Sequence, residues 1–152
     1  MIVLHSPKEL LGLVGNKLGV SDWFAVEQQH LDAFAQLTGD DNWIHVDTER
    51  AKREMPGGCT IAHGLFTLSL VPVLQRDLLR IDKRGKGINY GLDRVRYTAP
   101  VPVGSRIRLN QTLTAAERVG SATRFKTRCE MEIEGSDRPA LIAEFIVQIH
   151  DE

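Results

Sequence analysis

The spacing of the hydrophobic residues changes about half-way along the chain. Between residues 27 and 79 they recur at intervals of three and four, as on one face of a helix. Between residues 88 and 150 they alternate with polar residues, as in strands that are buried on one side. A helical part followed by a stranded part indicates an α+β fold, in which an antiparallel sheet packs against helices.

Two amphipathic helices are expected in the first part of the chain. The first covers about residues 27–38 and should end at Gly39, because glycine readily adopts the left-handed conformation that closes a helix. The second should follow Asp47, whose side chain can accept hydrogen bonds from the first free amides, and should run to about residue 54. These two boundaries place His45 between the helices.

A third helix is predicted over about residues 62–79. Its hydrophobic residues are distributed around almost the whole circumference, so we expect a long central helix that is buried on most sides. Pro72 should kink this helix or end its regular part. The segment falls short of the ~20 mainly apolar residues that a membrane-spanning helix requires.

Four strands are predicted in the second part of the chain. Alternation is strongest over residues 124–134, where four hydrophobic residues and Thr127 face one way and charged residues face the other. The remaining three segments are 88–97, 106–113 and 140–149, of which the last has apolar residues on both faces, as a more central strand would. The simplest arrangement is a curved antiparallel sheet wrapped around the helix of residues 62–79.

Composition narrows the functional classes. A chain of 152 residues, 42% of them hydrophobic, fits one compact domain spanning residues 1–152. The 19 basic and 20 acidic side chains give no electrostatic case for binding nucleic acid or a membrane. Cys59 and Cys129 lack the spacing of a zinc site, and the N-terminus lacks the uninterrupted apolar core of a signal peptide. We therefore expect a cytoplasmic protein.

The segment 38–45, Thr-Gly-Asp-Asp-Asn-Trp-Ile-His, carries the clearest candidate chemistry. It places Asp40 and His45 five residues apart just beyond a predicted helix end. Aspartate is normally a carboxylate at neutral pH, whereas histidine can accept or donate a proton there, so the pair could hold and activate one water molecule. On spacing alone, the polar residues could simply form a turn. A metal site built from Asp40, His45 and Asp47 is chemically possible, but no spacing here is diagnostic of one, and we expect no metal.

Three segments together resemble the MaoC-like hydratases, the group that contains the R-specific enoyl-CoA hydratases (hydratase 2). They are residues 38–45, the Ile-Ala-His-Gly of residues 61–64, and the Tyr-Thr-Ala-Pro-Val-Pro-Val-Gly of residues 97–104. The resemblance covers about residues 20–150. Trp43 departs from it, because proline is usual there, and so does Pro72, in a stretch where relatives often have a serine that Ser69 could replace.

The resemblance implies a hot-dog fold and the hydration of a trans-2-enoyl-CoA to an (R)-3-hydroxyacyl-CoA, or the reverse dehydration, without metal or other cofactor. It implies that Asp40 and His45 are catalytic, with Asp40 as the principal base and His45 orienting the water. The amide of Gly64 would stabilise the oxyanion of the thioester, which the missing side chain of this residue would allow to approach. Asn42 and His63 would complete the substrate-binding site, although His63 is also a good candidate for a structural role that fixes its loop.

The resemblance also implies a homodimer whose coenzyme A thioester substrate binds at the junction of helix and sheet. Three alternatives on the same fold stay open from the sequence. They are an acyl-CoA thioesterase, a dehydratase of hydroxyacyl-carrier protein, and a noncatalytic acyl-thioester-binding subunit. The last would normally tolerate loss of Asp40 or His45, and both are present.

Overall fold

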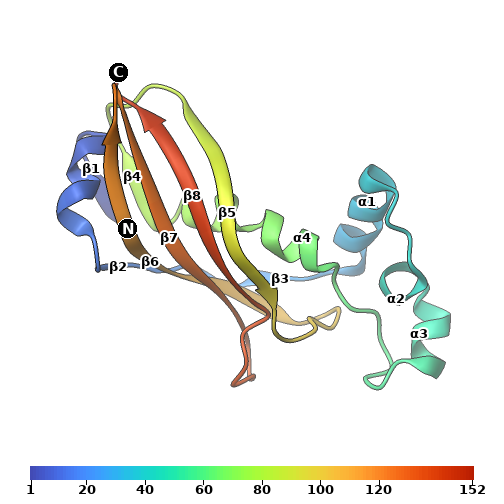
Figure 1. Cartoon of the computed structure of the whole chain (residues 1–152). Helices are drawn as coiled ribbons and strands as arrows, with labels where there is room; N and C mark the ends of the chain where they lie inside the picture. The colour runs from blue at the N-terminus through green and yellow to red at the C-terminus, as the bar shows by residue number, and fades with distance from the viewer.

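A computed structural model describes residues 1–152 and shows a curved sheet with helices against its concave face and beyond one end (Figure 1). The helices are the 3-10 helix η1 (Pro7–Leu13), α1 (Gln28–Thr38), α2 (Trp43–Val46), α3 (Thr48–Glu54), α4 (Gly64–Ser69) and α5 (Val71–Gln75). The strands are β1 (Ile2–Leu4), β2 (Lys17–Val20), β3 (Phe24–Ala25), β4 (Leu79–Ile81), β5 (Gly87–Tyr97), β6 (Arg106–Val119), β7 (Ala122–Ile133) and β8 (Leu141–His150). None of the helices is both long and apolar enough to cross a membrane.

The main sheet is antiparallel throughout, in the order β2-β6-β7-β8-β5, and β3 also pairs with β6. Strand β7 lies between β6 and β8, so that Cys129 faces Gln111 on one side and Ala143 on the other. Strand β5 pairs only with β8 and forms an open edge. Strands β1 and β4 form a separate parallel pair.

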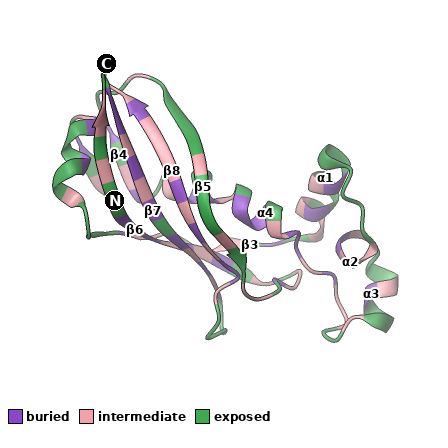
Figure 2. Ribbon diagram, viewed as in Figure 1, coloured by how far each residue is buried: buried purple, intermediate pink, exposed green.

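The predicted alternation in β7 is confirmed. In β7, buried residues alternate with more accessible ones (Figure 2), and all five residues of the inward face are buried: Phe125, Thr127, Cys129, Met131 and Ile133. Cys129, Met131 and Ile133, together with residues of β6 and β8, form the core that packs against α4 and α5. A second, smaller core lies between the other end of the sheet and η1, β1 and β4.

The predictions of α1, α3 and the four long strands are confirmed, with β6 extending six residues beyond the predicted end at residue 113, to Val119. Gly39 ends α1 in the left-handed conformation (φ 80°), and the Asp47 side chain accepts a hydrogen bond from the Arg50 N–H (2.9 Å) at the start of α3. His45 lies between α1 and α3, as predicted, but residues 43–46 form a further short helix, α2, which the sequence pattern did not indicate.

The prediction of one long central helix is wrong. The segment forms α4 and α5, separated at Leu70, and the chain then turns into β4. Pro72 lies in the first turn of α5, where its missing N–H costs no helical hydrogen bond, so proline begins a second helix here instead of kinking one. The helical segment is also not buried on most sides, since Leu65 is 61% exposed and Val73 is 44% exposed.

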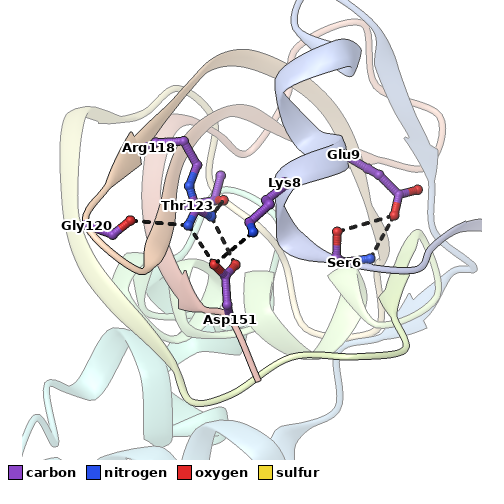
Figure 3. Close-up of polar contacts among 7 residues, drawn as sticks. All are labelled: Ser6, Lys8, Glu9, Arg118, Gly120, Thr123 and Asp151. Carbon is purple, nitrogen blue, oxygen red and sulfur yellow. Dashed lines mark hydrogen bonds and ion pairs between the residues drawn. The ribbon is translucent and has the colours of Figure 1, made fainter.

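An ion-pair cluster fastens the end of the chain (Figure 3). Arg118, near the end of β6, donates hydrogen bonds to both carboxylate oxygens of Asp151 (3.0 and 2.6 Å), to the Thr123 hydroxyl near the start of β7 and to the Gly120 carbonyl in the β6–β7 turn. Lys8 of η1 lies 3.6 Å from the same carboxylate. The hydrogen bonds from Arg118 are the main reason why the pKa of Asp151 is lowered. The cluster thus joins η1, the β6–β7 turn and the C-terminus.

Candidate active site

The candidate catalytic residues lie where the chain leaves α1 and enters α2. After Gly39 closes α1, the chain turns through Asp40, and the Asn42 side chain accepts a hydrogen bond from the Ile44 N–H (3.4 Å) to cap α2. This cap starts the turn of helix that carries His45, whose side chain is 8% exposed. The Asp40 side chain remains exposed beside it. A helix end, a turn and a capped short helix therefore bring the two residues together.

A main-chain carbonyl fixes the protonation of the His45 ring. Nδ1 of His45 lies 2.7 Å from the carbonyl oxygen of Ile61, and because a carbonyl can only accept, Nδ1 carries the hydrogen. In the neutral ring the lone pair is then on Nε2. Ile61 is itself held, since its N–H donates to the Ile44 carbonyl of α2 (3.0 Å). Two hydrogen bonds between these segments therefore orient His45.

The environment of His45 favours the neutral ring. Its pKa is lowered from the ordinary histidine value, chiefly because burial disfavours the charged form and in part because of the neighbouring His63. The hydrogen bond to Ile61 and the carboxylate of Asp40 act in the opposite direction but do not prevail. At neutral pH the ring can therefore accept a proton at Nε2.

His63, immediately before α4, stacks on His45. The ring centroids are 3.8 Å apart and the ring planes are inclined by 26°. His63 is only 2% exposed, and its Nε2 lies 2.9 Å from the main-chain carbonyl oxygen of Asp40, to which it donates. Its Nδ1 is buried without a hydrogen-bond partner. His63 thus contacts both candidate catalytic residues.

A cavity of about 290 Å³ opens beside His45. Its wall is mainly apolar and includes Gly64 at the start of α4. The N–H of Gly64 has no acceptor within the chain, as is normal for the first amides of a helix. The remaining lining residues are Ile61, Ala62, Thr67, Tyr97, Thr98, Ala99, Pro100, Val101 and Ala140.

The chain matches one protein family over most of its length. Residues 10–134 match the family model described as a MaoC-like domain, which is most of the chain. The chain belongs to the MaoC-like family. Its relatives include the 3-hydroxyacyl-thioester dehydratase Z of Mycobacterium tuberculosis (strain ATCC 25618 / H37Rv), which is 45% identical over 149 residues that cover 97% of this chain and 98% of the relative. Nodulation protein N of Rhizobium leguminosarum bv. viciae is 43% identical over 138 residues, which cover 90% of this chain and 86% of the relative.

The similarity to solved structures confirms the predicted hot-dog fold. The (R)-hydratase from A. caviae involved in PHA biosynthesis superposes with a TM-score of 0.66, covering 88% of this chain and 94% of the hydratase at 24% sequence identity. The antiparallel sheet of this MaoC-like chain, with α4 and α5 against its concave face, is therefore a hot-dog sheet.

The MaoC-like chain brings three of the residues singled out from the sequence into one cluster. Ligand atoms of Asp40, His45 and His63 all lie within 4.8 Å of one another. Asn42 serves as the cap of α2, and Ser69 donates its hydroxyl to the Phe66 carbonyl (2.7 Å), so that this bond occupies the hydroxyl proton of the serine considered as a substitute for the family's residue.

The surroundings of Gly64 differ from the sequence-based expectation. We expected its missing side chain to leave room for a thioester, but the ring of Tyr97 lies there, and a Cβ added to Gly64 would be 2.9 Å from two ring carbons. Tyr97 and Thr67 also line the cavity, and sequence reasoning did not single them out as individual site residues. Tyr97 begins the motif segment 97–104, whereas Thr67 lies outside the three motif segments, and only the folded chain brings both to the cavity wall.

The three clustered side chains are also possible metal ligands, and their arrangement fits that role poorly. A metal ion binds an imidazole nitrogen in the plane of the ring, at ~2.0–2.1 Å for zinc. The planes of the stacked rings of His45 and His63 are nearly parallel, so one ion could not easily lie in both. One nitrogen of each ring is also committed to a carbonyl group. Asp47, the third ligand considered from the sequence, caps α3 instead. The cluster is better arranged for proton transfer.

Proposed function

We propose that this MaoC-like protein is a hydro-lyase that adds water to trans-2-enoyl-CoA to give (R)-3-hydroxyacyl-CoA, or catalyses the reverse dehydration. The observation that carries the proposal is the convergence of Asp40 and a neutral His45 beside an apolar cavity. The names of two relatives, a 3-hydroxyacyl-thioester dehydratase and, at 30% identity, a 3-hydroxybutyryl-CoA dehydratase from Methylorubrum extorquens, support this class of reaction.

The spacing of the pair suits one bridging water. A water whose two O–H groups, about 105° apart, each donate a hydrogen bond of ~2.8 Å places the two acceptors about 4.5 Å apart. A ring nitrogen of His45 and a carboxylate oxygen of Asp40 lie within 4.8 Å of each other, which is compatible with this separation. Nε2 of His45 would accept from one O–H of the water and the Asp40 carboxylate from the other, which directs the water oxygen towards a substrate in the cavity.

In the hydration direction, the water oxygen forms a bond to C3 of the enoyl group while Asp40, as the principal base, takes a proton from it. The C2–C3 double bond breaks and its electron pair moves towards the thioester, so that an enolate forms. A proton is then returned to C2, with His45 assisting the transfer, and one water has been added overall. The reaction forms one C–O bond and transfers protons, with no net oxidation or reduction. We therefore infer that it requires no metal or redox cofactor.

The amide of Gly64 is the proposed donor to the enolate oxygen. It is unpartnered, lies at the start of α4 and belongs to the cavity wall. Removing one donor of this kind typically lowers kcat by about 100- to 1,000-fold. A hydrogen bond from this amide to the enolate oxygen would therefore contribute substantially to the rate.

The test is a hydration assay with crotonyl-CoA, followed by loss of the conjugated enoyl thioester and by chiral analysis of the product. We expect Asp40→Asn and His45→Gln each to lower kcat by about 100-fold or more, because each removes a proton-handling group. Asp41→Asn is the matched control, since Asp41 is the adjacent exposed carboxylate and has no side-chain bond to the pair. Near-wild-type turnover in folded variants of either Asp40 or His45 would refute the proposal.

Two measurements separate this function from the alternatives on the same fold. Release of free thiol on mixing with acyl-CoA would indicate a thioesterase, because hydration leaves the thioester bond intact. A comparison of CoA and carrier-protein thioesters would separate the two dehydratase classes, since the name of the mycobacterial relative specifies only a thioester. Loss of water from neither thioester would indicate a noncatalytic subunit.

We further propose that the protein acts as a homodimer in the cytoplasm. Support for the dimer is the open edge of β5, which pairs only with β8 and exposes Ile88, Tyr90 and Leu92 by 43%, 54% and 43%. An unpaired strand edge with apolar side chains is normally covered, and pairing across a two-fold axis would cover it. Both cysteines are free, which is compatible with a reducing compartment.

A further inference from the structure

His63 is the most deeply buried member of the Asp40–His45–His63 cluster, and it is not among the residues that line the cavity. Its ring packs between His45, at a centroid distance of 3.8 Å, and Phe34 of α1, at 4.9 Å. His45, on which it stacks, lines the cavity, whereas the His63 ring forms no part of the cavity wall. Any role in the reaction must therefore act through its neighbours.

The first neighbour is Asp40. The Asp40 side chain is exposed and receives no hydrogen bond from the protein, so packing does little to fix it. Its main-chain carbonyl, however, accepts the hydrogen bond from Nε2 of His63 (2.9 Å). This bond joins the turn after α1 to the residue before α4, which are 23 positions apart. It therefore limits how far the carboxylate can move from the start of α4.

The second neighbour is His45. Ring stacking fixes the plane of the His45 imidazole, while the hydrogen bond to Ile61 fixes its rotation within that plane. Both contacts come from residues 61–63, so one short segment sets the orientation of His45 and the position of Asp40. The same short stretch of backbone therefore positions both of the groups that must share a water.

The unsatisfied Nδ1 of His63 is an independent indication that this residue is not chosen for packing alone. Since Nε2 donates to a carbonyl, the neutral ring carries its lone pair on Nδ1, which is buried and has no donor. A buried acceptor without a partner destabilises the folded protein. A phenylalanine of similar shape would keep the stacking and avoid this cost, but it would leave the Asp40 carbonyl without its donor.

We infer that His63 is a positioning residue of the proposed reaction, which holds Asp40 at the distance from His45 that one bridging water requires. The inference rests on the proposed function. It assigns His63 no contact with substrate, in contrast to the substrate-binding role expected from the family resemblance.

Two substitutions separate the hydrogen bond from the packing. His63→Phe keeps a stacked ring and removes the donor, and we expect it to lower kcat by about 10- to 100-fold, because small displacements of catalytic groups have effects of that size. KM should change by less than about threefold, since the cavity wall is untouched. His63→Gln keeps an N–H at a similar reach, and it should recover part of the lost kcat.

Thermal unfolding of each variant shows whether it is folded at the assay temperature. His30→Gln is the control, because His30 is also an imidazole that stacks on Phe66 and accepts a capping bond in α1, but it does not contact the Asp40–His45 pair. It should lower stability and leave kcat within about twofold, since no catalytic group moves.

The outcomes are distinguishable. A folded His63→Phe enzyme with wild-type kcat would overturn the inference, and so would a His63→Gln enzyme that is no more active than His63→Phe. If Asp40→Asn and His45→Gln keep their activity in the same assay, the proposed function itself has failed. If those two lose activity while His63→Phe keeps it, only the positioning role is wrong.

Discussion

Substitution of Gly64 by alanine tests the close packing at the start of α4. A Cβ on Gly64 would lie 2.9 Å from two carbons of the Tyr97 ring and 3.0 Å from a third, which is well inside normal contact distance. Gly64 does not need the left-handed conformation, since it is absent from the glycines with positive φ. The only obstacle to a side chain at this position is therefore the Tyr97 ring.

Two opposing effects decide the change in stability. Replacing a helical glycine by alanine stabilises a protein by up to about 1 kcal/mol, because glycine loses more backbone freedom on folding. Forcing an extra methyl group into occupied space costs about 1–3 kcal/mol. Since Tyr97 is 48% exposed and can move outward, we expect the lower part of that range. A cost of about 1–1.5 kcal/mol less a helix gain of about 0.5–1 kcal/mol leaves a net loss of at most about 1 kcal/mol, or a fall in Tm of at most about 2–4 °C for a chain of this length.

The same substitution should have the opposite sign when Tyr97 is alanine. In the Tyr97→Ala background the clash is gone, so Gly64→Ala should stabilise the protein by about 0.5–1 kcal/mol. The measurement is a double-mutant cycle of unfolding free energies in urea, with an expected coupling of about 1–2 kcal/mol. A cycle without coupling would show that the Tyr97 ring does not fill the space over Gly64.

Three further predictions concern the site, the chain end and the sheet edge. Burial lowers the pKa of His45, and only the neutral ring accepts a proton, so the acidic limb of the kcat–pH profile should lie below pH 6.5, the ordinary histidine value. An acidic limb above pH 6.5 would contradict this. Arg118→Ala should lower Tm at neutral pH, because Arg118 stabilises the charged carboxylate of Asp151. The loss of Tm should become smaller as the pH falls through the lowered pKa of Asp151, and an equal loss at neutral and acidic pH would contradict this account. Leu92→Lys should dissociate the proposed dimer in light scattering, whereas Leu37→Lys, at an 85% exposed residue of α1, should not.

Much of the fold could be predicted because the long elements carry their own periodic signal. The alternation along β7 and the three- and four-residue spacing of α1 directly reflect which face is buried. The short strands β1 to β4 and η1 were missed, since two to seven residues are too few to show a period. The break between α4 and α5 lies at Leu70, two residues before Pro72, where the sequence indicated that the helix would kink or its regular part would end. Proline is also compatible with the start of a new helix, and the sequence pattern does not show which of these applies.

The candidate site was predictable only in part, for a related reason. Asp40 and His45 are five residues apart, so a local motif could indicate that they act together. The stacking of His63 on His45 and its bond to the Asp40 carbonyl join residues 18 and 23 positions apart, and no local pattern specifies such contacts. The same holds for Tyr97, which reaches Gly64 from the end of β5.

The bond between His45 and the Ile61 carbonyl has a consequence for how the site can change over generations. The group that selects the basic nitrogen of His45 is a main-chain oxygen, which every amino acid supplies. Substitutions at position 61 can alter the cavity wall, and therefore which substrates fit, while leaving the acid–base character of the imidazole intact. Insertions or deletions in the loop that precedes Ile61 have no such protection, because they move the oxygen itself. The site can therefore tolerate substitutions at position 61 that change which substrates fit, but not changes in the length of the loop before it.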